Sequence, residues 1–324
     1  MFTLRSAAPP TDSRFAADVQ FYLMQNPRQL PSRYLYDALG SALFDAICRL
    51  PWYPLARAEA RLIEAHGEEI FSRLDSVTTI VELGPGSGEK LVWLLSAAGV
   101  QRSHVDVHLV DISRDALALA SRAVGALPDV DVVTHEATYE AGLSQLRDAP
   151  KRSGRTLLLF LGSNIGNFDP PGCEAFLRAI RASLAPDDAL LIGADLVKPE
   201  RDLLLAYDDP LGVTAAFNRN LLVRLNQELG GAIDVDAFAH RAVWNASASR
   251  VEMHLVSHGS QRVQIPGAGV DFEMSDGESI WTESSYKYEP DGIVETLARG
   301  GFAVTNQWID ADGRFALTLA ACEC

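Results

Sequence analysis

The sequence predicts a doubly wound α/β fold, with a Rossmann-like sheet, joined to a second, smaller α+β domain. Short apolar runs alternate with helical patterns through the middle of the 324-residue chain. A glycine-rich loop separates the first of these runs from the helix that follows it. After Asp195 the alternation stops for about 95 residues, far more than an ordinary connection between strand and helix needs. Alternating strands and helices form a parallel sheet covered by helices on both faces.

The strands of this sheet are expected where the apolar runs are short and bounded by turn residues. These runs are 77–82, 105–110, 130–134, 156–161 and 189–194, and two more close the domain at 302–308 and 314–321. Between them, helical periodicity is clear in segments such as 173–184, where residues 176, 177, 180 and 184 are apolar. Ligands of such sheets bind at the carboxyl ends of the strands.

The second domain is expected to combine the N-terminus with the long insertion. Residues 213–229 have a helical pattern, and alternating runs such as 251–256 are typical of antiparallel strands. The first 57 residues are mostly helical in pattern and precede the sheet. We therefore predict a cofactor-binding domain from 58–196 and 286–324. The substrate-binding domain would consist of 1–57 and 197–285 and close over the carboxyl edge of the sheet.

Composition narrows the class of protein. The net charge of −15 argues against a nucleic-acid partner, because phosphate binding requires a basic surface. No apolar run reaches membrane-spanning length, and the N-terminus has no signal-peptide core. The four cysteines (Cys48, Cys173, Cys322 and Cys324) have neither metal-binding nor disulfide spacing. We expect a cytoplasmic monomer that binds no metal, membrane or nucleic acid.

The segment Glu82–Lys90 has the features of a nucleotide-binding loop. It follows an apolar strand, contains Gly84, Gly86 and Gly88, and leads into a helical pattern. Glycines there leave backbone amides bare beside a bound small molecule. The next predicted strand ends in Asp111, and an acid at that position can accept both hydroxyls of an adenosine ribose. An adenosine-containing cofactor is therefore expected, and a tight turn without a ligand is the alternative.

The spacing of the loop distinguishes between cofactors. The dinucleotide fingerprint is Gly-x-Gly-x-x-Gly, whereas this loop reads Glu82-x-Gly84-x-Gly86-x-Gly88. An acid at the strand end would be unfavourable beside a pyrophosphate but suits a cationic ligand. The loop resembles the first motif of methyltransferases that use S-adenosyl-L-methionine (SAM), whose cofactor carries a sulfonium. A nicotinamide-dependent dehydrogenase is disfavoured by the spacing.

Several longer segments carry a more specific resemblance, which runs from about residue 33 to the C-terminus. The matching segments are 34–44, 82–90, 160–168, 195–198, 206–209, 212–220 and 282–287. Together they resemble the L-histidine Nα-methyltransferases of ergothioneine biosynthesis.

The resemblance implies that SAM donates three methyl groups in turn to the α-amine of L-histidine, forming hercynine. Transfer is a displacement at the sulfonium methyl, so positioning of a neutral amine dominates the catalysis. The implied catalytic residues are Tyr36, near the amine, and Gly162, at the tip of the fourth strand. The implied substrate-binding residues are Asn167 and Tyr207 for the carboxylate, Tyr53, Glu283 and Ser285 for the imidazole, and Met253 as a pocket wall. The implied cofactor-binding residues are Gly84, Gly86, Ser87, Lys90, Asp111, Thr138, Tyr139, Gly162 and Ser163.

Two positions depart from the family pattern. After the third strand the family has Gly-Asp-Phe, whose acid reaches the adenine amine, and this chain has Ala137-Thr138-Tyr139. The family's Tyr-Tyr-Pro-Thr-Arg corresponds here to residues 53–57, in which Tyr53 is retained but its neighbours differ. We expect weaker cofactor binding from the first change. The second leaves open an N-methyltransferase of another amino acid or aromatic amine, and a non-catalytic cofactor-binding partner protein is the further alternative.

Overall fold

The computed structural model describes residues 13–97, 104–148 and 154–322 and so leaves Cys324 outside the described chain. These residues divide into two compact units. The first unit consists of the described residues up to Ile47 together with Glu200–Asn245 and Val251–Ser284. The second consists of Cys48–Pro199, Ala246–Arg250 and the chain from Ser285 onward. Within the described chain, no helix combines the length and apolar character needed to cross a membrane.

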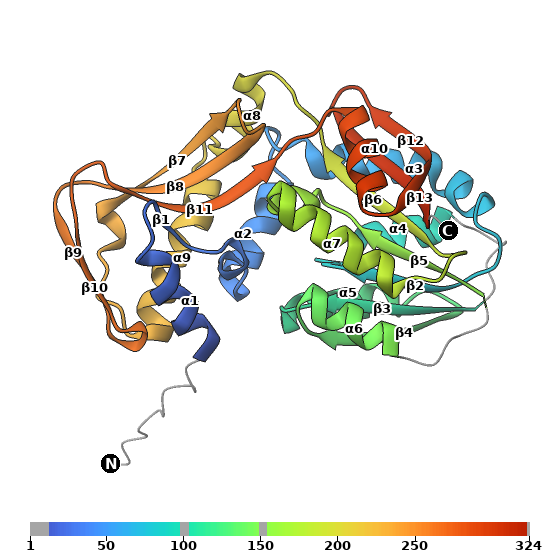
Figure 1. Cartoon of the computed structure of the whole chain (residues 1–324), viewed down its shortest axis with the longest axis horizontal. Helices are drawn as coiled ribbons and strands as arrows, with labels where there is room; N and C mark the ends of the chain where they lie inside the picture. The colour runs from blue at the N-terminus through green and yellow to red at the C-terminus, as the bar shows by residue number, and fades with distance from the viewer. Residues whose placement is uncertain (1–12, 98–103, 149–153, 323–324) are drawn as a thin grey trace, which may run out of the picture. The chain divides into compact units, whose positions relative to one another are not determined.

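The second unit contains a seven-stranded sheet in the order β12-β13-β6-β5-β2-β3-β4 (Figure 1). Its strands are β2 (Val77–Leu83), β3 (Val105–Asp111), β4 (Val130–Glu136), β5 (Arg155–Phe160), β6 (Ala189–Asp195), β12 (Phe302–Asp310) and β13 (Phe315–Cys322). The five strands from β4 to β6 are parallel. The predicted doubly wound, Rossmann-like sheet is confirmed.

Of the last two strands, only β13 runs against the rest of the sheet. β13 pairs antiparallel with β6, placing Phe315 opposite Asp195, and β12 pairs antiparallel with β13. A short turn joins β12 directly to β13, and strands joined in this way must be antiparallel, whereas parallel neighbours need a crossover. β6 and β13 are apolar at nearly every position because both faces of these strands are buried.

Helices cover both faces of this sheet. α3 (Leu55–Ser72), α4 (Glu89–Ala97) and α5 (Arg114–Val124) form one contiguous layer. The other layer consists of α6 (Tyr139–Asp148), α7 (Pro170–Ser183) and α10 (Pro290–Arg299), on the near face in Figure 1. α7 illustrates the pattern, since it buries residues 173, 176, 177 and 180 against the sheet and begins with Asp169 as a side-chain cap.

The strand order creates a switch point between β2 and β5. From β2 the chain proceeds to β3 and β4 on one side, whereas β5 leads to β6 on the other side. The chain therefore leaves β2 and β5 in opposite directions, and open α/β sheets bind their ligands at such a switch point, at the carboxyl ends of the strands.

The first unit is an α+β structure, as predicted. Its four-stranded sheet has the order β1-β11-β8-β7, and β9 pairs antiparallel with β10. These strands are β1 (Arg28–Gln29), β7 (Phe238–Asn245), β8 (Arg250–Ser257), β9 (Gln261–Ile265), β10 (Val270–Met274) and β11 (Ser279–Tyr286). Its helices are α1 (Ser13–Leu23), α2 (Ala38–Cys48), α8 (Glu200–Tyr207) and α9 (Val213–Leu229), and α9 packs against β7 and β9. Every second residue of β8 is buried, which gives the alternation that its sequence predicts.

Candidate functional site

The glycine loop connects β2 to α4 at the carboxyl edge of the large sheet. All three of its glycines have positive φ, between 55° and 79°. Gly88 also permits close packing, because a Cβ there would lie 2.8 Å from the backbone of Ala120 in α5. Gly86 differs, since nothing lies within 4 Å of the place where its Cβ would be. The loop therefore leaves open space beside Gly86, where a ligand can approach the backbone.

Glu82, the last acid before this loop, is almost completely buried (1 % exposed), and its Oε2 has no hydrogen-bond partner. Burial disfavours the charged carboxylate and raises the pKa of Glu82 to about 8, although the nearby Lys90 ammonium acts in the opposite direction. A buried polar atom without a partner is costly. A ligand that brought a positive charge or a donor to Glu82 would relieve that cost.

Asp111 ends β3, the neighbour of β2 in the sheet. Its Oδ1 accepts a hydrogen bond from the Ser113 amide at 2.8 Å, which fixes the orientation of the carboxyl group. Burial raises the pKa of Asp111, while backbone hydrogen bonds lower it in part. An oriented carboxylate at a strand end can accept both hydroxyls of a ribose.

Thr138 and Tyr139 follow β4, and α6 begins at Tyr139. Tyr139 packs edge-on against Phe160 of β5, with ring centroids 5.5 Å apart, and its hydroxyl would lie only 2.6 Å from a Cβ at position 84. Burial raises the pKa of the Tyr139 phenol, so it remains a neutral group. Thr138 Oγ1 accepts a hydrogen bond from the Ala141 amide at 3.4 Å, and so caps the helix.

Gly162 and Ser163 form the turn after β5, with φ values of 76° and 60°. A left-handed conformation is uncommon for serine, and here it is held by a hydrogen bond from the Asp195 amide to Ser163 Oγ at 2.9 Å. The side chain of Ser163 is thus engaged in the fold. Gly162 is anchored as well, because its amide donates to the carboxylate of Glu59. The second unit therefore brings together, at one sheet edge, the cofactor-binding residues that the sequence predicts.

Four of the predicted substrate-binding and catalytic residues lie in the first unit: Tyr36, Tyr207, Met253 and Glu283. Tyr36 follows a 3-10 helix at Ser32–Leu35 and contacts Phe44 and Phe217 edge-on, each with ring centroids 5.5 Å away. This aromatic packing restricts the ring of Tyr36.

A polar network in the first unit fixes the backbone around Tyr207 and Met253. Asn218 Nδ2 donates to His240 Nδ1 at 2.9 Å, so His240 is neutral and carries its proton on Nε2. His240 Nε2 then donates to the carbonyl of Tyr207 at 2.8 Å. Thr282 Oγ1 lies within hydrogen-bond distance of both Asn218 Oδ1 and the Met253 carbonyl. This network was not predicted, because its members come from α8, α9 and three strands.

The remaining three predicted substrate-binding residues, Tyr53, Asn167 and Ser285, belong to the second unit. Tyr53 precedes α3 and is 7 % exposed, and Asn167 ends a 3-10 helix that follows the Gly162 turn. Lys287 Nζ donates to Ser285 Oγ at 2.8 Å and also lies 2.9 Å from Asp195 Oδ2. Because an ammonium has no lone pair, Ser285 Oγ is the acceptor in this contact.

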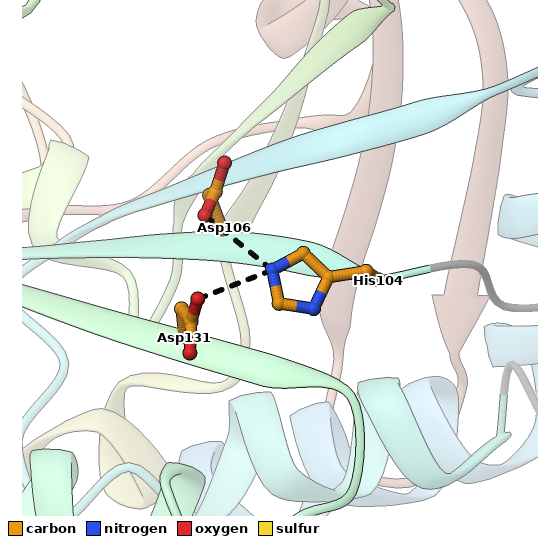
Figure 2. A group of neighbouring side chains, drawn as sticks. All are labelled: His104, Asp106 and Asp131. Atoms are coloured by element: carbon orange, nitrogen blue, oxygen red, sulfur yellow. Dashed lines mark ion pairs between the residues drawn. The ribbon is translucent and has the colours of Figure 1, made fainter.

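A group with possible metal-binding spacing occurs elsewhere in the second unit. Figure 2 shows His104 beside Asp106 and Asp131, with His104 Nε2 3.7 Å and 3.3 Å from their carboxylate oxygens. These residues lie where β3 and β4 begin, at the edge of the sheet opposite the glycine loop. Their side chains are 31–74 % exposed, and a histidine between two exposed acids is an ordinary surface ion pair.

Comparison with known proteins gives a consistent result. Residues 15–322 match the family model described as "Histidine-specific methyltransferase, SAM-dependent". The chain is 38 % identical over 318 residues to histidine N-alpha-methyltransferase of Mycolicibacterium smegmatis, covering 97 % of both chains. It is 40 % identical to the protein of the same name from Mycobacterium tuberculosis, covering 94 % of each. Ergothioneine biosynthesis protein 1 of Neurospora crassa is 28 % identical over 79 % of this chain, which spans 31 % of that protein.

Proposed function

Because the chain belongs to the family of histidine-specific, SAM-dependent methyltransferases, we propose that it trimethylates the α-amine of L-histidine to hercynine in ergothioneine biosynthesis. The substrate is supported by the two mycobacterial relatives, which are matched over nearly their whole length. The pathway is supported by the name of the Neurospora relative. Cys48, Cys173 and Cys322 are not joined in disulfides, which fits a reducing compartment, and we place the reaction in the cytoplasm.

The residues at the sheet edge fit SAM, which supplies an electrophilic methyl group on a sulfonium. Gly84, Gly86, Ser87 and Lys90 would hold the methionine part, and Lys90 would pair with its carboxylate. The buried, unpartnered Oε2 of Glu82 suits the positive charge of this cofactor better than it suits a pyrophosphate. Asp111 would hold the ribose, and Thr138 and Tyr139 would lie beside the adenine.

The observation that carries the substrate proposal is the pair Glu283 and Ser285. These residues are two positions apart on β11, so their side chains leave the same face of the strand. A carboxylate accepts a hydrogen bond from an imidazole N–H, and a hydroxyl can serve the other nitrogen. We propose that Tyr53 completes the imidazole contacts and that Met253 forms a wall. Indole has one ring nitrogen and could bind only one member of the pair.

The remaining roles concern the reacting end of the substrate. We propose that Asn167 and Tyr207 bind the α-carboxylate, and that Tyr36 and the backbone of Gly162 orient the amine. The phenol of Tyr36 can accept a hydrogen bond from an amine N–H and so direct the nitrogen lone pair towards the methyl group. Holding a neutral amine in line is the contribution that such a site makes to the rate.

The test is methyl transfer from SAM to a panel of amino acids that includes histidine, its mono- and dimethyl forms, tryptophan and phenylalanine, followed by mass spectrometry. We expect three methyl groups on histidine and none on the aromatic amino acids. Equal turnover of tryptophan would support the wider amino-acid N-methyltransferase instead. Cofactor binding without any turnover would support a non-catalytic binding protein.

The role of Glu283 is tested separately with Glu283→Ala. We expect the KM for histidine to rise about tenfold or more, because a charge-assisted hydrogen bond is lost. The affinity for S-adenosylhomocysteine should be unchanged. Glu273→Ala is the matched control, since Glu273 is an exposed glutamate on a strand of the same unit. A loss of S-adenosylhomocysteine binding in Glu283→Ala would contradict the assignment of Glu283 to the substrate.

A further inference from the structure

Glu59 is a charged residue buried within the second unit. It lies on α3, is 0 % exposed, and comes from a part of the chain outside the strand–loop segments that form the sheet edge. Its Oε2 pairs with Lys90 Nζ at 2.7 Å, and both oxygens accept the Gly162 amide, at 2.8 Å and 3.0 Å. An isolated buried carboxylate is very unfavourable, so these two contacts are what permits Glu59 to be there.

The surrounding backbone leaves room for this carboxylate. A Cβ at Gly193, in the middle of β6, would lie 2.0 Å from Glu59 Oε1. A Cβ at Gly162 would lie 2.9 Å from Lys90 Nζ. Two glycines therefore border the ion pair, and any larger residue at position 193 would displace the Glu59 side chain. The absence of a side chain at Gly193 thus provides the space that the Glu59 carboxylate occupies.

The two partners of Glu59 lie in the segments that follow two adjacent parallel strands. Lys90 lies in the first turn of α4, directly after the glycine loop that follows β2, and Gly162 begins the turn after β5. One carboxylate thus links both sides of the switch point. Burial disfavours the charged form of Lys90, but the Glu59 carboxylate outweighs this effect and raises the lysine pKa. Lys90 keeps its charge, and its three donors allow it to hold Glu59 and a ligand carboxylate together.

The attachment of α3 to the sheet has other sources. Arg61 forms two hydrogen bonds of 2.7 Å with Asp310 of β12, and Trp308 Nε1 donates to Glu69 at 3.0 Å. In addition, α3 buries Leu62, Ile63 and Ile70. Packing of the helix therefore does not require a charged residue at position 59. The presence of a buried charge there needs a different explanation.

We infer that Glu59 is a positioning residue for the cofactor: it fixes the ammonium of Lys90 and the backbone of Gly162 relative to each other. This inference rests on the proposed roles of Lys90 and Gly162. Through Lys90, Glu59 affects binding of the methionine carboxylate. Through the Gly162 amide, it sets the backbone beside which the methyl group is transferred.

The first experiment uses Glu59→Gln, which retains an acceptor for the Gly162 amide and removes the charge that orients Lys90. Calorimetric binding of S-adenosylhomocysteine should be weakened about tenfold or more. The KM for histidine should change by less than about twofold. Glu64→Gln is the matched control, because Glu64 is an exposed glutamate on the same helix. Wild-type affinity in folded Glu59→Gln, with only a lower free energy of unfolding, would overturn the inference.

A second set of variants establishes through which residue Glu59 acts. In a Lys90→Met background, Glu59→Gln should cause no further loss of S-adenosylhomocysteine affinity, and an undiminished loss there would overturn the coupling. If Glu59→Gln does not fold, Glu59→Asp replaces it. The shorter carboxylate keeps its charge but withdraws from Gly162, so kcat should fall while the histidine KM stays constant. Wild-type kcat and affinity in Glu59→Asp would again overturn the inference. A wild-type protein that binds S-adenosylhomocysteine but does not methylate histidine would refute the proposed substrate alone.

Discussion

Replacement of Glu82 by glutamine should make the stability of the protein less dependent on pH. Glu82 is almost completely buried at the end of β2, and burial raises the pKa of its carboxyl group from 4.5 to about 8. Between these two values the folded state retains a proton that the unfolded chain releases. Rising pH therefore favours unfolding across this interval, and the loss is complete once the folded-state carboxyl is also ionised above pH 8.

The size of the effect follows from the same pKa values. The gap between 4.5 and about 8 corresponds to about 5 kcal/mol of free energy of unfolding, spread over the interval at no more than about 1.4 kcal/mol per pH unit. Glu82→Gln keeps the shape of the protonated acid and has no charge to bury. We expect wild type and variant to be similar near pH 5 and the variant to become more stable by several kcal/mol at pH 9.

Urea unfolding followed by tryptophan fluorescence between pH 5 and pH 9 measures this difference. Glu89→Gln serves as the matched control, because Glu89 is an exposed glutamate at the start of α4. Its pH profile should parallel that of wild type. Identical slopes for wild type and Glu82→Gln would refute the reasoning, since they would mean that Glu82 does not titrate abnormally in the folded protein.

Two further predictions concern other buried titratable groups. Burial lowers the pKa of His240, so the free energy of unfolding should fall as pH decreases below about 6.5. In urea titrations, His240→Gln should lack this part of the loss. If the variant lost as much stability at low pH as wild type, the neutral His240 that donates to the Tyr207 carbonyl would be contradicted. Lys287→Met removes one of the partners of the buried Asp195 and the donor to Ser285, and should lower the free energy of unfolding at pH 7 by about 3 kcal/mol. A loss below about 0.5 kcal/mol in the same urea assay would show that the pair contributes nothing beyond its packing.

The parallel strands were predictable because their physical signal is local. The run at 105–110 and the strand Val105–Asp111 nearly coincide, since a strand buried on both faces needs consecutive apolar residues. The glycine loop and Asp111 were predictable for a similar reason: each lies directly at a strand end, and the topology of a parallel sheet brings those ends together. The antiparallel pairing of β13 with β12 follows from the short turn between them, whereas the pairing of β13 with β6 has no such local signal.

Glu59 could not be recognised from the sequence. It precedes the buried Leu62 and Ile63 by three and four positions, so helical spacing puts it on the buried face, but spacing does not say which groups it contacts there. Its contact with Gly162 spans 103 positions, and the space it occupies depends on a glycine in another strand. The partners of a buried charge are a tertiary property, and the local pattern does not encode them.

The charges at the carboxyl edge of the large sheet nearly cancel, which explains why the acids Glu59 and Glu82 are tolerated there. Glu59 and Lys90 neutralise each other, and Glu82 is mostly protonated near pH 7. These three residues therefore add little net charge before a ligand binds. SAM carries an ammonium, a sulfonium and a carboxylate, and therefore brings one net positive charge. That charge stabilises the ionised form of Glu82, so binding should release a proton. S-adenosylhomocysteine has an uncharged thioether in place of the sulfonium. Its binding should release fewer protons, because only its ammonium remains to favour ionisation of Glu82.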